Sequence, residues 1–478
     1  MKPHRVEKRA AGAVGTLAVG RLLLQGAAAV LFPALLAAQA AEETATGPSE
    51  QRLLDWTRPR FPAAEYERRR EAVRAGIADS SGVILIPSAH GLSHGETFRQ
   101  ADDFHYLTGL EIPQSVLVID LPTGRPTLFA PRRDFRFEND ARPNDFPGRP
   151  LADDPALATV SGVGDIRPLE SLEVALREWS RLGVTVHVDA GRSGQIRQVV
   201  TSLIPDWDPL LLSLYHLQST YPGLRLANAF DAIARARMAK SALEIEAMRR
   251  SVRTTEAAIR AAARDIRDGV TERALEGSFE AGCKRNGAQR IAFAPIIKSG
   301  PNSLWPWRVL ASHYDRRNRA MHDGELVIFD VGCEVDHYVS DVGRTFPVSG
   351  TFTAAQRAAL EIELAVADAI VAAVRPGVTL TELQGVAEAA IPEEARPHMQ
   401  TGLFFGHHIG LSTGDPGLAD APLEPGMVFT VEPWYYNHRT GISVFTEDEI
   451  LVTEDGAELL TGTLPRDPDG LESLIRER

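Results

Sequence analysis

The chain has few cysteines, and this scarcity limits how the fold can be held together. Only Cys283 and Cys333 occur among its 478 residues. Two cysteines form at most one disulfide, so a disulfide framework is excluded. Cys333 follows Asp330 by three residues and could act as a soft metal ligand, but a small core residue is the better interpretation. Nothing in the sequence decides whether the two thiols meet.

Basic residues are also fewer than acidic residues. Lysine and arginine number 51 against 64 aspartates and glutamates, which gives a net charge of −13. Nucleic-acid binding is therefore not expected, because phosphate recognition needs a basic surface. With 44% hydrophobic and 24% charged residues, the composition is typical of a globular protein. The length predicts two or three domains.

A long uncharged apolar run occurs only near the amino terminus, at Leu22–Ala41. It ends in the small residues Ala38-Gln-Ala40 and follows several basic residues: Lys2, Arg5, Lys8, Arg9 and Arg21. This pattern predicts a signal peptide over residues 1–40 and export to the periplasm or the medium, followed by a linker over residues 41–60. The run is long enough for an uncleaved membrane anchor, which is the alternative.

The rest of the chain divides into two predicted domains. Strands at 83–86, 116–119 and 184–188 alternate with helices at 63–77 and 169–182, which predicts an α/β domain over residues 61–225. Prolines between 204 and 228 mark the boundary. Over residues 226–478, a helix at 241–266 and another opened by the capping box Thr379–Glu382 alternate with two hairpins, which predicts an α+β domain.

The two hairpins bring four carboxylates into facing pairs. Strands at 325–332 and 337–348, with a turn centred between Val335 and Asp336, place Asp330 opposite Asp341. Segments 427–432 and 442–447, turning through 437–441, place Glu432 opposite Glu447 in the same way. Facing carboxylates among Val, Phe and Ile side chains are destabilising without a cation.

Two divalent metal ions would neutralise these four carboxylates. His407 would add one nitrogen ligand, and a set of oxygens with a single imidazole suits Mn, Co, Fe or Zn. Such a set argues against a closed structural zinc site and favours a two-metal centre that activates water.

The motifs around these residues resemble those of the pita-bread metallopeptidases. They are Phe329-Asp330-Val-Gly, Ser340-Asp341-Val-Gly-Arg-Thr, Gly406-His407-His-Ile-Gly, Thr430-Val-Glu432-Pro and Glu447-Asp-Glu-Ile. Upstream, residues 98–109 resemble the amino-terminal domain of aminopeptidase P, and residues 237–250 resemble that family's entry into its catalytic domain. The resemblance extends over residues 65–464.

This resemblance implies a peptidase that removes an amino-terminal residue preceding proline, usually with manganese. Asp330 would bind one ion, Asp341 and Glu447 would bridge both, and His407 and Glu432 would hold the other. Glu432 would accept the proton of the attacking water, and His313 would steady the substrate carbonyl. Family members are often dimers or tetramers, so a homo-oligomer with a peptide substrate and no stable membrane contact is expected.

Three positions depart from the family pattern. Gly414 and Leu403 stand where relatives usually have histidines, and Phe445 stands where they have arginine two residues before the second bridging glutamate. Proline specificity is therefore less well supported than metal-dependent hydrolysis. A prolidase-type dipeptidase is the closest alternative, and a weakened protein that only binds metal or peptide is another. The Gly91-Leu-Ser93-His-Gly95 segment fits a serine hydrolase pattern but lacks the helix that must follow it.

Overall fold

The computed structural model describes residues 59–90, 97–132, 152, 155–191, 209–312, 314, 317–399, 406–418 and 420–477. The predicted signal peptide, the first 18 residues of the predicted linker, Ser93, His313 and Leu403 lie outside these ranges. Among the described residues, no helix combines the length and the apolar composition that crossing a membrane requires.

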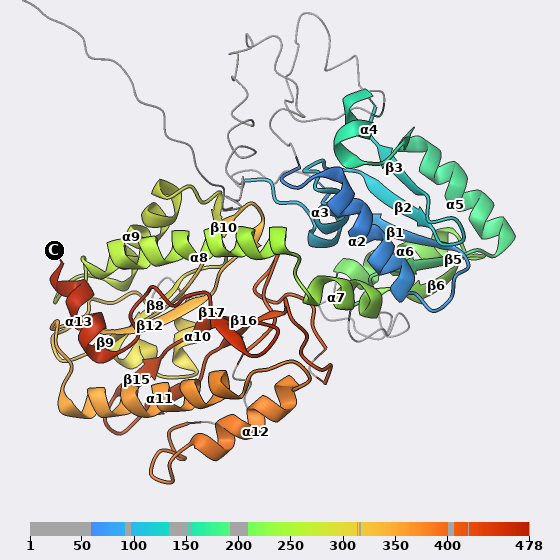
Figure 1. Cartoon of the computed structure of the whole chain (residues 1–478). Coiled ribbons are helices and arrows are strands. Elements are labelled where there is room, and N and C mark those ends of the chain that lie inside the picture. The colour runs from blue at the N-terminus through green and yellow to red at the C-terminus, as the bar shows by residue number, and fades with distance from the viewer. Residues whose placement is uncertain are drawn as a thin grey trace, which may run out of the picture. The chain divides into compact units, whose positions relative to one another are not determined.

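A six-stranded mixed sheet forms the first part of the described chain (Figure 1). Its strand order is β4-β3-β2-β1-β5-β6, with β1 antiparallel to β2 and parallel to β5. The elements of this part are α2 (Ala63–Gly76), β1 (Val83–Pro87), α3 (Asp102–Thr108), β2 (Val116–Asp120), β3 (Pro126–Ala130), α4 (Pro155–Ser161), β4 (Asp165–Pro168), α5 (Glu170–Leu182), β5 (Thr185–Val188), α6 (Pro209–Thr220), β6 (Arg225–Asn228) and α7 (Phe230–Met238). The predicted helices and strands of this α/β part are confirmed. The domain limits stay predictions, and β6 begins at the last residue of the first predicted domain.

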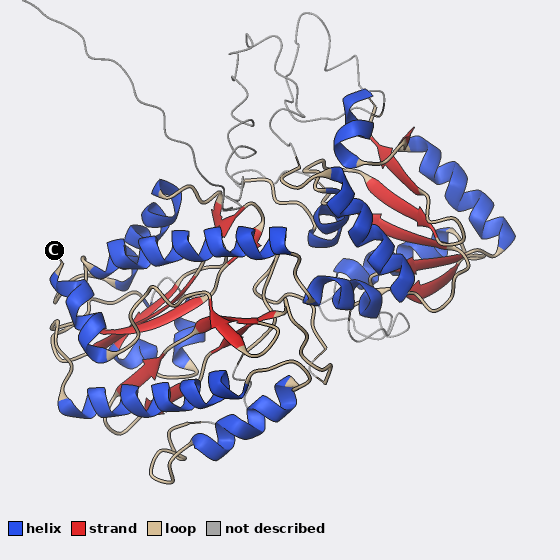
Figure 2. Ribbon diagram, viewed as in Figure 1, coloured by secondary structure: helices blue, strands red, loops and turns tan. Residues whose placement is uncertain are grey.

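Short antiparallel sheets form the second part, with helices α8 and α9 on one side of the strands and α11 and α12 on the other (Figure 2). Its helices are α8 (Ala242–Ala263), α9 (Glu272–Arg285), the 3₁₀ turn η1 (Gly300–Ser303), α10 (Trp307–Ser312), α11 (Ala354–Ala373), α12 (Leu380–Ala390) and α13 (Pro468–Arg476). Its strands are β7 (Arg290–Ile291), β8 (Ile296–Ser299), β9 (Leu326–Val331), β10 (Cys333–Val335), β11 (Tyr338–Val339), β12 (Val342–Pro347), β13 (Val428–Val431), β14 (Trp434–Asn437), β15 (Ile442–Phe445), β16 (Asp448–Val452) and β17 (Ala457–Leu459).

Two apolar clusters enclose these strands. One joins α8 and α9 to β9 and β12 through side chains such as Ile259, Phe279 and Phe346. The other joins α11 and α12 to β13 and β16 through side chains that include Ile370 and Leu383. Strands that are buried on both faces consist mostly of apolar residues. An acidic side chain within such a strand is costly to bury unless a cation or hydrogen bonds compensate its charge.

Capping residues set the beginnings of the long helices. Ser241 accepts the backbone N–H of Glu244, whose side chain in turn accepts the N–H of Ser241, and α8 starts directly after this box. Thr379 and Glu382 form the same reciprocal pair at the start of α12. Both predicted helix starts are confirmed.

The register predicted for the first hairpin is wrong by two residues. Asp330 pairs with Gly343, not with Asp341, and the turn consists of Asp336 and His337, whose φ angles are 53° and 68°. A two-residue hairpin turn of this type requires positive φ at both positions. A turn centred one residue earlier would force β-branched Val335 into that region, whereas aspartate and histidine enter it more readily. Because side chains alternate with a period of two, Asp330 and Asp341 still share one face.

The register of the second hairpin is confirmed. Val431 pairs with Asp448 and Trp434 with Phe445, and the same register places Glu432 opposite Glu447. The ladder is longer than predicted, because β13 pairs with β16 beyond the two glutamates while β14 pairs with β15 on the turn side.

The two cysteines form a disulfide that joins α9 to β10. Both are fully buried, which agrees with the interpretation of Cys333 as a core residue and removes it as a metal ligand.

Candidate metal centre

Four strand ends and one loop position the five predicted ligands. Asp330 lies near the end of β9, Asp341 directly before β12, Glu432 directly after β13 and Glu447 directly before β16. His407 lies beside β13, where its carbonyl oxygen accepts the backbone N–H of Thr430 at 2.9 Å.

Close backbone contact at Gly343 joins the two hairpins. Its N–H donates to the carbonyl of Glu447, and the N–H of Glu447 donates back, both at 3.1 Å. A Cβ at position 343 would lie 2.4 Å from the Phe445 ring and 2.8 Å from the Cβ of Glu447. Only glycine permits this approach, which brings the ligands of both hairpins to one place.

The predicted ligands converge on the His407 ring. Its Nε2 lies 3.6 Å from Oδ2 of Asp341, 3.7 Å from Oε1 of Glu432 and 4.0 Å from Oε1 of Glu447. Ligand atoms of Asp341, His407 and Glu447 lie within 4.8 Å of one another. Asp330 lies at the edge of this group, where its Oδ2 is 3.5 Å from Nη2 of Arg308.

Burial and mutual repulsion raise the pKa values of these carboxylates, so their ionised forms are unfavourable unless a cation is bound. Burial, and then the charges of Asp330 and Glu432, raise the pKa of Asp341 well above its ordinary value. Burial and the charge of Asp341 do the same to the pKa of Glu447. Burial raises the pKa of Glu432 to about 8, and Asp330 adds to that rise. Burial also raises the pKa of Asp330, which Arg308 opposes.

The donor set fits divalent metal ions. Oδ1 of Asp341 and Oε1 of Glu447 are buried and have no hydrogen-bond partner among the described residues, so both offer free lone pairs to a cation. Burial lowers the pKa of His407, which favours the neutral imidazole that a metal requires. The His407 side chain is 28% exposed, so the centre opens to solvent on its side.

Several site residues were missed from the sequence. Glu449 is fully buried, its Oε1 accepts the N–H of Asp341 at 3.0 Å, and burial raises its pKa to about 8. The alternation Glu447-Asp448-Glu449 was the available signal, because residues two apart on a strand share a face. Arg308 was missed as well, although an arginine within Trp305-Pro-Trp307-Arg308 is unusual enough to notice.

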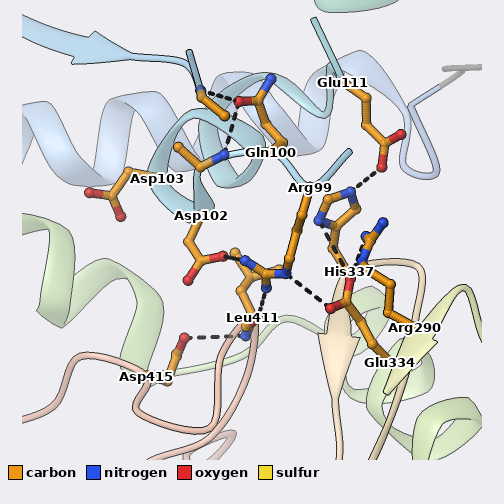
Figure 3. A network of polar contacts seen from close by, with 12 residues as sticks. Arg99, Gln100, Asp102, Asp103, Glu111, Arg290, Glu334, His337, Leu411 and Asp415 are labelled. Atoms are coloured by element: carbon orange, nitrogen blue, oxygen red, sulfur yellow. Dashed lines mark hydrogen bonds and ion pairs between the residues drawn. The ribbon is translucent and has the colours of Figure 1, made fainter. Parts of the chain in front are cut away.

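A polar network fixes the segment that follows His407 (Figure 3). Asp415 accepts the backbone N–H of Leu411 at 3.2 Å and is paired with Arg237 and Lys240. Arg99 donates to the Leu411 carbonyl and, at 2.9 Å, to Glu334. Figure 3 shows Arg99 and Glu334 meeting near Leu411, with Asp415 on the other side of the Leu411 backbone. The loop carrying His407 is thereby anchored at its far end.

Two family models match the chain. The metallopeptidase family M24 matches residues 246–454, and the aminopeptidase P amino-terminal domain matches residues 66–184. The Xaa-Pro aminopeptidase of Escherichia coli (strain K12) is 30% identical over 465 residues, which cover 86% of this chain and 97% of that protein. The chain belongs to the aminopeptidase P family.

Two further proteins are similar to part or to most of the chain. An Xaa-Pro dipeptidase of Pyrococcus furiosus is 35% identical, but over 241 residues that cover 49% of this chain and 66% of that protein. The solved structure of zinc-substituted E. coli aminopeptidase P in complex with product has a TM-score of 0.70 and 27% identity, covering 87% of this chain and 99% of that one.

Membership of the aminopeptidase P family establishes three predictions at once. The fold is an amino-terminal α/β domain followed by a pita-bread catalytic domain, and the protein is a hydrolase of the metallopeptidase class. Dependence on divalent metal ions is a property of the family.

Proposed function

We propose that this aminopeptidase P family member is a two-metal Xaa-Pro aminopeptidase, which hydrolyses the bond between an amino-terminal residue and a following proline. The observation that carries the proposal is the convergence of Asp341, Glu432 and Glu447 on the His407 ring, in a chain that matches an Xaa-Pro aminopeptidase over nearly its whole length.

Each residue has a proposed role. Asp330 would hold one ion, Asp341 and Glu447 both, and His407 with Glu432 the other. Bound ions would polarise the scissile carbonyl and make water a better nucleophile. Glu432 would accept the proton of the attacking water, because its carboxylate lies among the predicted ligands, 3.7 Å from the His407 ring. His313, as the group that steadies the carbonyl, stays a prediction because it lies outside the described residues.

Manganese is the proposed metal, because an oxygen-rich set with one imidazole suits it, and zinc, cobalt or iron would bind the same donors. Export is proposed from the amino-terminal pattern of residues 1–40. The Cys283–Cys333 disulfide supports export, since structural disulfides persist mainly in oxidising compartments. A homo-oligomer is proposed from the resemblance alone.

A prolidase-type dipeptidase is the second candidate. The shorter match to the P. furiosus Xaa-Pro dipeptidase favours it less than the full-length match favours the aminopeptidase. A weakened protein that only binds metal or peptide is disfavoured, because the proposed catalytic residues His313 and Glu432 are retained together with the complete ligand set.

The test compares hydrolysis of Ala-Pro, Ala-Pro-Ala and Ala-Ala-Ala by the manganese-loaded protein. We expect Ala-Pro-Ala to be cleaved with the highest kcat/KM and Ala-Ala-Ala to be left intact. Faster cleavage of Ala-Pro would favour the dipeptidase, and cleavage of none of the three would refute peptidase activity on proline substrates.

A further inference from the structure

Arg308 is a buried cation at the edge of the carboxylate cluster. It lies on α10, only 4% of it is exposed, and its Nη2 is 3.5 Å from Oδ2 of Asp330. Its charge acts on Glu432 as well as on Asp330, because it opposes the rise in the pKa of both. The guanidinium therefore forms an ion pair with one of the predicted metal ligands, Asp330.

Three aromatic rings hold this guanidinium. Its Cζ lies 4.1 Å from the ring centroid of Phe445, 4.6 Å from that of Trp434 and 5.6 Å from that of Trp305. Guanidinium groups stack well on aromatic faces because they are planar and weakly hydrated. Trp434 and Phe445 are a cross-strand pair that lies two residues from Glu432 and Glu447. The hairpin that carries two predicted ligands thus also fixes the arginine.

The hydrogen bonding of Arg308 is incomplete. Its Nε is buried and has no partner in the part of the chain that the structure describes. Buried donors are nearly always paired, and leaving one unpaired costs about 1–3 kcal/mol. If Arg308 only filled space in the core, its unpaired Nε would destabilise the fold without any compensating interaction. An apolar side chain at this position would avoid that cost.

We propose that Arg308 is a positioning residue of the metal centre, which holds the carboxylate of Asp330 in one orientation. Phe445 provides one of the rings on which the Arg308 guanidinium stacks. The inference rests on the proposed metal-dependent function.

The experiment measures Mn²⁺ affinity by calorimetric titration, and kcat and KM on Ala-Pro-Ala, for the full chain and for Arg308→Met. We expect Mn²⁺ affinity and kcat to fall by about 10–100-fold, the usual effect of losing a group that orients a metal ligand, with KM little changed. Arg308→Lys keeps the charge but loses the planar stack, so its losses should be smaller. Unchanged or tighter Mn²⁺ binding in Arg308→Met would overturn the proposal.

A rescue variant separates positioning from packing. Phe445 touches the guanidinium, so Arg308→Met combined with Phe445→Arg can return a guanidinium to the same space and should recover at least about a tenth of the lost affinity. A folded double variant that binds Mn²⁺ no better than Arg308→Met would count against a positioning role for the guanidinium. Arg317→Met is the matched control, because Arg317 is exposed and stacks 5.2 Å from Trp307 in the same segment. Wild-type protein that binds Mn²⁺ but cleaves no proline peptide would refute the proposed function and leave the Arg308 result interpretable.

Discussion

Glu363, on α11, is a buried acid that lies outside the five predicted ligands but contacts Thr446, the residue directly before Glu447. It is fully buried, and its Oε1 accepts the N–H of Thr446 at 2.8 Å. Burial raises its pKa from 4.5 to about 8, and the hydrogen bond from the Thr446 N–H only partly opposes this rise. The folded state therefore holds this acid as a neutral group near pH 7.

Glu363→Gln should change the pH dependence of stability. Below pH 4.5 the acid is protonated in both states, so the wild type and the variant should be similar in stability. As the pH rises from 4.5 to about 8, the unfolded chain ionises Glu363 while the folded chain does not, and the wild type loses stability. The variant should gain a growing advantage across this window, by at most about 1.4 kcal/mol for each unit between the two pKa values. Urea unfolding at pH 4.5, 6 and 8 measures it, and an advantage that is the same at all three values would contradict the assignment.

Residue identities in the cluster were predictable from the sequence, but their partners were not. The five predicted ligands lie in short sequence motifs and can be recognised without the structure: Asp330, Asp341, His407, Glu432 and Glu447. Arg308 and Glu449 reach the cluster through contacts between distant segments, Arg308 with Asp330 and Glu449 with Asp341. The alternation Glu447-Asp448-Glu449 indicates that Glu449 shares a face with Glu447, but the groups that Arg308 and Glu449 contact depend on how α10 and β16 pack.

At the scale of elements, turn chemistry decides which side chains meet. Asp336 and His337 accept positive φ, and this shifts the first hairpin by two residues from the register expected from its strand pattern. The alternation of side chains correctly predicted that Asp330 and Asp341 share one face of the sheet. It did not predict that Asp330 pairs with Gly343 and not with Asp341. The second hairpin was predictable because its loop ends in Gly441, whose φ is 70°.

Gly343→Ala should separate the two hairpins. The added methyl would meet the Phe445 ring and the Cβ of Glu447, so we expect a loss of about 1–3 kcal/mol of stability and at least about a tenfold loss of Mn²⁺ affinity. Gly385→Ala is the matched control, because it lies exposed on α12 with open space around it and should be stabilising by about 0.5–1 kcal/mol. Thermal melting and metal titration check both, and equal behaviour of the two variants would show that the close approach is unimportant.

At the scale of the whole molecule, polar contacts and one disulfide tie distant segments together. Arg237, on α7, pairs with Asp103 at 2.7 Å and also with Asp415, which anchors the loop after His407. The disulfide closes a separation of 50 residues between α9 and β10, next to the strand that carries Asp330. The order of the domains and the fold class could be predicted from composition and motifs. The contacts between these distant segments could be identified only from the structure.

Replacing both Cys283 and Cys333 by alanine should lower the free energy of unfolding by about 2–4 kcal/mol. A loop of this length confines the unfolded chain substantially when it is closed. Denaturant unfolding of the oxidised wild type and the double variant measures the difference. A thiol titration of the denatured, unreduced wild type should detect no free cysteine, and two free thiols there would contradict the disulfide.

The most direct test of the metal centre is the number of Mn²⁺ ions bound per chain, followed together with hydrolysis of Ala-Pro-Ala before and after removal of metal by a chelator. We expect two ions per chain, loss of activity with their removal and recovery on adding Mn²⁺. Asp341→Asn, which takes away a group proposed to touch both ions, should stay folded while binding Mn²⁺ far more weakly and showing no measurable turnover. Full activity in metal-free wild-type protein, or an Asp341→Asn variant that binds two ions and works normally, would contradict the account.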